Sequence, residues 1–181
     1  GLGIYYYDDD LDLNDMGYLI LNDRLQFNGR TQFKKTDFSK DSSLRARLFE
    51  IGYGSKFNAD STRESSNMAF KIETNFKNLS EIKTEIFYRS TGRNTRITRG
   101  SNLSPYILMP KGVGGYIEFT GPRRPLYIYS LRHERGKGSE HSPEIGWKNS
   151  SRVYIKFMPL DTLSLNMMYQ YAEESNWLNW L

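Results

Sequence analysis

The polarity of the side chains alternates with a period of two residues along most of this chain, and this pattern constrains the fold more than any other feature. In residues 68–76 the apolar or uncharged side chains of one face alternate with the other face's Ala69, Lys71, Glu73 and Asn75. The same alternation recurs in 82–89, 145–157 and 163–171. Because successive side chains of a β-strand point to opposite faces of the sheet, this period predicts strands with one apolar and one polar face.

The pattern predicts eight antiparallel strands of an all-β, up-and-down meander: 17–33, 44–57, 67–77, 81–90, 112–121, 125–135, 143–158 and 161–172. From the second strand onward the connections alternate between long and short, which places the short turns together at one end of the sheet. That asymmetry is typical of outer-membrane barrels. The connection 34–43 is an exception, because it has ten residues where a short turn is expected. We therefore predict a transmembrane β-barrel, part of a larger barrel, with about eight strands in this chain.

A membrane barrel is apolar outside, where lipid contacts it, and polar inside. The polar face of the predicted strands would then line a lumen, and five of its charged residues are candidate solute contacts: Lys71, Glu73, Lys83, Glu85 and Arg89. The long 91–111 connection adds Arg93, Arg96 and Arg99 as a candidate gate, plug or partner contact. A half-exposed soluble sheet alternates in the same way, so a soluble β-sandwich that binds carbohydrate through Tyr and Trp is the alternative.

The 181 residues are predicted to form a single domain, with an acidic lead-in at 1–16, strands over 17–172 and the start of a further element at 173–181. We expect the chain to be a section of a longer protein, because its last residues begin a new apolar pattern. It contains no Cys, which excludes disulfides, thiol nucleophiles and zinc ribbons. No apolar run approaches the roughly 20 residues of a transmembrane helix.

The densest group of hard oxygen ligands lies near the start of the chain. Asp8, Asp10, Asp12 and Asn14 would share one face at period two, and their oxygen atoms suit calcium. The spacing differs from an EF-hand loop, which needs Gly at its sixth and Glu at its twelfth position. The alternative is a solvated acidic strand. Calcium is therefore the one cofactor that the sequence suggests.

The sequence contains no arrangement typical of an active site, which argues against enzyme activity without excluding it. Residues 139–142 include Ser, Glu and His, but sequence neighbours cannot usually face one another as nucleophile, base and orienting group. Glu73 and Glu85 could face each other from adjacent strands, as the two carboxylates of a glycoside hydrolase do. Each has a Lys two residues away, Lys71 or Lys83, which favours ion pairing instead. A glycan hydrolase is therefore a second alternative.

Basic residues concentrate in the middle of the chain. Residues 83–138 contain eleven Lys or Arg and three Glu, while the whole chain has a formal net charge of +4. Such a patch could contact nucleic acid, anionic lipid or an acidic glycan. No nucleic-acid-binding motif accompanies the charge, so nucleic acid is not expected as a partner.

One segment resembles a known family. Residues 12–20, Asp-Leu-Asn-Asp-Met-Gly-Tyr-Leu-Ile, are similar to a D-x-N-D-φ-G-[FY]-L segment in a C-terminal domain of unknown function. That domain occurs in large bacterial outer-membrane proteins. Further similar segments are 98–100, 124–126 and 157–165. In that family the domain is expected to be a β-barrel, and it follows an N-terminal module similar to family-9 carbohydrate-binding modules.

The resemblance implies a location in the bacterial outer membrane and a role in anchoring or translocation that is linked to polysaccharide handling. The partners that it implies are the lipid bilayer, a glycan and the N-terminal sugar-binding-like module, which would lie outside this chain. It supplies no catalytic residues. The soluble alternative would instead lie in the periplasm or outside the cell.

Overall fold

The computed structural model of this chain describes residues 1–7, 24–58, 63–94, 107–122, 124–138, 145–160 and 162–175. These residues form strands, turns and short irregular connections. They contain no helix that is long and apolar enough to cross a membrane.

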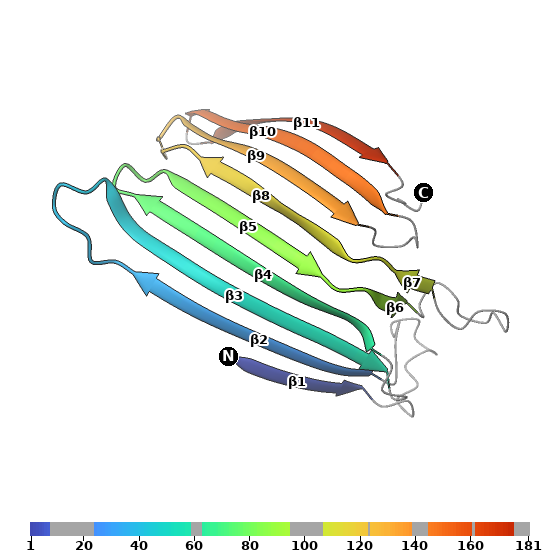
Figure 1. Cartoon of the computed structure of the whole chain (residues 1–181). Coiled ribbons are helices and arrows are strands. Elements are labelled where there is room, and N and C mark those ends of the chain that lie inside the picture. Colours follow the sequence, from blue (N-terminus) through green and yellow to red (C-terminus); the bar gives the residue numbers. More distant parts are fainter. Residues whose placement is uncertain are drawn as a thin grey trace.

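The architecture is one antiparallel sheet of nine strands in the spatial order β1-β2-β3-β4-β5-β8-β9-β10-β11 (Figure 1). Its strands are β1 (Leu2–Tyr7), β2 (Arg24–Lys35), β3 (Leu44–Asn58), β4 (Arg63–Phe76), β5 (Glu81–Arg89), β8 (Gly112–Thr120), β9 (Tyr127–Gly138), β10 (Gly146–Leu160) and β11 (Leu163–Ser175). Each strand pairs with its neighbour in this order, so the sheet is an up-and-down meander. The predicted all-β class and antiparallel meander are confirmed, and each of the eight predicted strands overlaps an observed one.

Three strands lie outside the predicted set. β1 pairs with β2 from Leu2↔Gly29 to Tyr7↔Arg24, although its residues belong to the predicted acidic lead-in. β6 (Gly92–Asn94) and β7 (Ile107–Met109) pair with each other within the predicted 91–111 loop. They were not predicted because three-residue strands are too short to establish a period of two.

The predicted sorting of long and short connections holds only in part. Because β3 and β4 extend further than the alternation indicated, the connection between them is 59–62, as short as the 77–80 turn on the opposite end. The connection between β2 and β3 is 36–43, the predicted exception. The asymmetry therefore depends on two segments at one end of the sheet, 8–23 and 90–111, rather than on every connection.

The turn between β4 and β5 shows how local chemistry reverses the chain. The side-chain Oδ1 of Asn78 accepts hydrogen bonds from Ser80 N at 3.0 Å and from Ser80 Oγ at 2.6 Å. Leu79 adopts a positive φ of 69°, and Phe76 N donates to Ser80 O at 3.0 Å. Asn is suited to this position because its short side chain bonds to the backbone two residues further on.

The sheet is open, and β1 and β11 are its two edges. It is curved, with β10 and β11 receding from β2 and β3 (Figure 1). No second layer covers either face within the described part of the chain, where Met109 is the only buried hydrophobic residue. The described residues therefore do not form the two-layer core that stabilises an ordinary soluble domain.

Candidate functional site

The register of the strands separates the side chains into two faces of opposite character. One row of partners runs Glu50↔Lys71↔Glu85↔Tyr116↔Glu134 from β3 to β9. The adjacent row on the opposite face runs Ile51↔Phe70↔Ile86. We call these the charged face and the apolar face. The charged face includes Arg30, Glu50, Lys71, Glu73, Glu81, Lys83, Glu85, Arg89, Glu118, Arg132, Glu134, Lys148 and Glu174.

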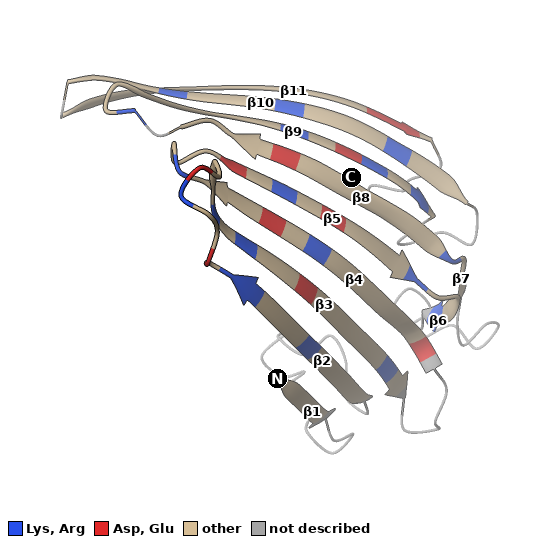
Figure 2. Ribbon diagram, turned by 60° about the vertical axis from the view of Figure 1, so that its left-hand side comes forward, with Lys and Arg blue, Asp and Glu red and all other residues tan. Residues whose placement is uncertain are grey.

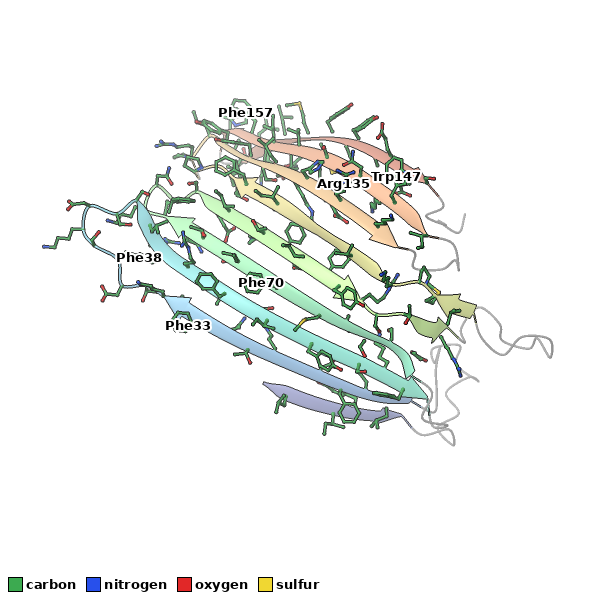
Figure 3. All side chains as sticks on the ribbon, viewed as in Figure 1. Phe33, Phe38, Phe70, Arg135, Trp147 and Phe157 are labelled. Atoms are coloured by element: carbon green, nitrogen blue, oxygen red, sulfur yellow. The ribbon has the colours of Figure 1, made fainter. Side chains whose placement is uncertain are left out.

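The apolar face is the exposed one. Ile86 retains 57% of its accessible surface and Phe70 retains 41%. Figure 3 shows the rings of Phe33 and Phe70 standing on the sheet with no layer of structure above them. The other exposed large apolar residues of this face include Ile51, Tyr53, Met68, Tyr88, Val113, Ile117, Leu131, Ile155, Phe157, Leu165, Met167, Tyr169 and Tyr171. A patch that spans a whole sheet marks a surface that contacts lipid or another protein.

The charged face is the more buried one. The Glu50 side chain retains 17% of its accessible surface and the Glu73 side chain retains 22%. Since no layer covers this face within the described part of the chain, the shielding comes from neighbouring side chains of the same face. Figure 2 shows basic and acidic positions alternating in a band across the strands. This polarity is the reverse of that of a soluble sheet, which buries its apolar side.

Ion pairs connect the side chains of the charged face. Arg30 and Glu50 approach at 2.5 Å, and the Gln32 amide also donates to Glu50 at 2.6 Å. Lys71 contacts Glu73 at 3.4 Å. Additional pairs are Lys83–Glu81 at 2.8 Å and Lys148–Glu174 at 3.9 Å. Opposite charges therefore alternate on β4 and β5, whereas the charged face of β10 carries the three bases Lys148, Arg152 and Lys156.

The most connected group on this face surrounds Arg132. Its guanidinium donates to Glu118 at 3.3 Å and to Glu134 at 3.1 Å, which places it between two carboxylates. The same group lies 3.7 Å from the centre of the Tyr116 ring, within the range of a cation–π interaction. Arg132 thus contacts Glu118 and Tyr116 of β8 and Glu134 of its own strand, β9. Arg132 is not among the candidate residues predicted from the sequence, although it lies on the same face of the sheet as its direct partner Glu118.

Four predicted lumen residues come together on the charged face. Lys71 is the direct partner of Glu85, and Glu73 is the direct partner of Lys83. Arg89 lies on the same face of β5, nearer the end of the strand. Arg93 is exposed in β6. The remaining two predicted residues, Arg96 and Arg99, lie outside the described residues.

The hypothesis of a carboxylate pair is not supported by the register. Glu73 and Glu85 lie on adjacent strands, but each is directly opposite a Lys instead of the other Glu. A glycoside hydrolase needs its two carboxylates to face each other across a substrate cleft. The alternation of Lys and Glu pairs the charges within the sheet instead.

The predicted calcium ligands Asp8, Asp10, Asp12 and Asn14 lie outside the described residues. In the described part of the chain, no group of three or more Asp, Glu or His side chains is placed to hold a metal ion. His133 forms a hydrogen bond between its Nδ1 and Ser151 Oγ at 2.9 Å. His133 lies directly opposite Ser151 of β10. Its hydrogen-bond partner is therefore a hydroxyl group and not part of a cluster of metal ligands.

On the apolar face the apolar side chains form a continuous band across the strands, which we call the belt. The position of the belt along the strand shifts from one strand to the next. On β2 the alternate residues from Leu25 to Phe33 form this belt, with Gly29 at its centre. The row of partners through Gly29 reaches Ser175 on β11. On β11, however, the belt runs from Leu163 to Tyr171 and is centred on Met167, eight residues from Ser175.

This shift gives the angle between the belt and the strands. Eight residues correspond to about 27 Å along a strand, and the seven steps from β2 to β11 correspond to about 34 Å across the sheet. If the belt lay parallel to the plane of a membrane, the strands would be tilted by about 40° from the membrane normal. The belt would then be about 21 Å tall. Transmembrane barrels have strand tilts of about 35–45° and apolar bands about 25 Å tall.

Comparisons with protein-family models, curated proteins and solved structures found no match to this chain. The features of the molecule that bear on its function are therefore the two faces of the sheet and the oblique belt.

Proposed function

We propose that this chain is a section of an outer-membrane β-barrel that anchors or translocates, with the charged face toward the lumen and the apolar face toward lipid. The observation that supports this most directly is the belt of exposed side chains on the apolar face. The angle between this belt and the strands matches the strand tilt of membrane barrels. In water this face would be costly at roughly 25 cal/mol per Å² of apolar surface. In a bilayer the same face needs no covering layer.

Closure of the barrel requires more strands than the sheet contains. The outer edges of β1 and β11 have no pairing strand among the described residues. Within a bilayer, each backbone N–H or C=O group without a hydrogen bond would cost roughly 2–7 kcal/mol, because it is transferred from water to an apolar environment. The proposal therefore includes further strands that pair with both edges.

The lumen of such a barrel would favour polar solutes of low net charge. Lys71, Glu73, Lys83 and Glu85 present alternating charges, and the Arg132 group adds hydrogen-bond donors beside the ring of Tyr116. Sugars bind through hydrogen bonds and stacking on aromatic rings. We propose that the solute or bound partner is a glycan, in agreement with the polysaccharide-linked role that the resemblance of residues 12–20 implies.

The first experiment distinguishes the proposed outer-membrane location from the soluble alternatives. The full-length protein is fractionated from its own cells, and detergent extracts are run on gels with and without heating. Recovery in the outer membrane with a heat-dependent shift in migration supports the proposal. Recovery in the soluble fraction without detergent would overturn it, and a soluble carbohydrate-binding sandwich in the periplasm or outside the cell would take its place.

The absence of native Cys in the chain allows a sharper test of the orientation. The neighbours Glu85 and Ile86 lie on opposite faces of β5, so Glu85→Cys and Ile86→Cys form a matched pair. In membranes containing the full-length protein, we expect a small charged thiol reagent to label Glu85→Cys and leave Ile86→Cys unlabelled. The reverse order of labelling would contradict the assignment of the two faces.

A further inference from the structure

Beyond the proposed barrel, one region of the apolar face has a different composition. On β9 the belt ends at Leu131, and the next three outward residues are His133, Arg135 and Lys137. On the neighbouring β10, Trp147 is the direct partner of Lys137. Figure 3 labels Arg135 and Trp147 on these two strands. This region lies just past the belt, at the end of the sheet where 90–111 and 139–145 connect strands.

A cavity of about 310 Å³ lies beside Lys137, two residues further along β9 than Arg135. Its wall is mainly apolar and includes Tyr88, Val113 and Ile145, while Lys111 and Lys137 stand at its sides. Tyr88, Val113 and Lys137 are consecutive partners in one row across β5, β8 and β9. The cavity therefore opens on the outer face of the sheet, where the belt gives way to polar residues.

Among the described residues, the charged side chains at this cavity and next to it on the outer face of β9 are basic. Lys111, Arg135 and Lys137 are exposed, and none of them forms an ion pair with a carboxylate of the described residues. On the charged face, by contrast, five basic side chains each form an ion pair with a Glu: Arg30, Lys71, Lys83, Arg132 and Lys148. Basic side chains at the border of a bilayer attract anionic headgroups, and aromatic side chains are enriched at the same depth.

We propose that Lys111, Arg135 and Lys137 bind the phosphate of an anionic membrane lipid, whose acyl chain lies in the apolar cavity beside them. The inference rests on the proposed membrane location, and it adds a specific partner on the outer surface. A phosphate is held by the three cations, and the hydrocarbon chain extends along Tyr88 and Val113 toward the belt. A free phosphate would use the cations alone, and it would leave the apolar wall in contact with water.

The test uses the full-length protein in detergent and measures bound lipid by native mass spectrometry. The probes are phosphatidylglycerol and phosphatidylcholine with identical acyl chains, which differ in net charge. The variant carries Lys111→Gln, Arg135→Gln and Lys137→Gln together. The control carries Lys35→Gln and Arg47→Gln, which change basic residues on the same face at the opposite border of the belt.

We expect the protein to retain phosphatidylglycerol over phosphatidylcholine, and the triple variant to lose this preference by at least roughly tenfold. The control should keep it. Equal retention of the two lipids by the unmodified protein, or an unchanged preference in the triple variant, would overturn the inference. Displacement of the lipid by millimolar inorganic phosphate would also overturn it, because it would indicate a phosphate site without an acyl-chain cavity.

The migration of the same samples on gels separates this inference from the proposed function. A triple variant that still shows a heat-dependent shift is folded, so its loss of lipid preference reports the site. If the unmodified protein is not recovered from the membrane at all, the barrel proposal fails first. If it is recovered there and shows no lipid preference, only the lipid site fails.

Discussion

The two faces of this sheet have the same backbone and opposite environments. On the charged face Glu50 and Glu73 are largely shielded by neighbouring side chains, whereas on the apolar face Ile86 and Phe70 are open. A soluble sheet shows the opposite distribution, because water is the solvent of its polar side. The comparison teaches that burial alone does not identify the core of this molecule. The exposed face is the one that requires a further apolar environment.

A second difference lies within the apolar face itself. In one row of partners, Ile86 on β5 corresponds to Asn149 on β10, although both project from the same side of the sheet. Residues at equal register therefore differ in polarity, and residues of equal polarity differ in register. The proposed membrane barrel would account for both facts, because a bilayer would contact a level band across tilted strands.

The largest effect is expected from a charge within the belt. Ile86→Arg should destabilise the protein by about 2–4 kcal/mol, and Asn149→Arg in the same row should cost about 0–1 kcal/mol because it lies beyond the belt. The measurement is the free energy of unfolding of the full-length protein in lipid vesicles by urea titration. Equal costs for the two variants would remove the argument for an oblique membrane boundary.

The next effect concerns close packing on the charged face. A side chain at Gly114 would meet Phe87 Cζ at 2.6 Å and the Arg135 carbonyl oxygen at 2.9 Å, whereas nothing lies within 4 Å of a Cβ at Gly52. Gly114→Val should therefore cost about 1–3 kcal/mol in unfolding free energy, the usual range for overpacking. Gly52→Val is the control on the same face. A larger cost at Gly52 would contradict the observed packing.

A smaller effect is expected at the centre of the ion-pair group. Arg132→Met removes the cation between Glu118 and Glu134 and should cost about 1 kcal/mol, since the side chains are partly exposed and solvent screens them. Arg152→Met, at the direct partner position on β10, is the matched control and should change stability by less than about 0.5 kcal/mol. The free energy of unfolding of both variants is measured by urea titration. Indistinguishable stabilities would mean that the group contributes no net stabilisation.

The smallest effect is expected where the charged face is most open. Arg30 pairs with Glu50, but its side chain is 59% exposed. Arg30→Met should cost less than about 0.5 kcal/mol, and the difference should vanish in 1 M salt. A loss well above this value, insensitive to salt, would indicate that this part of the face is more enclosed than the sheet alone suggests.

The alternation of residues 68–76 and 82–89 was sufficient to predict strands, their antiparallel order and the face on which Lys71, Glu73, Lys83 and Glu85 lie. It did not predict β1, because Leu2–Tyr7 includes a run of three Tyr that has no period of two. It also did not identify Arg132 as the centre of an ion-pair group. Parity assigns a residue to a face, but the cross-strand register decides which residues touch.

The sequence by itself determined the two faces, since the period of two follows from backbone geometry that every strand shares. Only the tertiary structure decided how the strands align. That alignment turned Glu73 and Glu85 from a possible carboxylate pair into two separate partners of Lys83 and Lys71. It also turned a set of separate apolar strands into one oblique belt. The reason is physical: register arises from contacts between distant segments, and no local pattern along the chain encodes the offset between them.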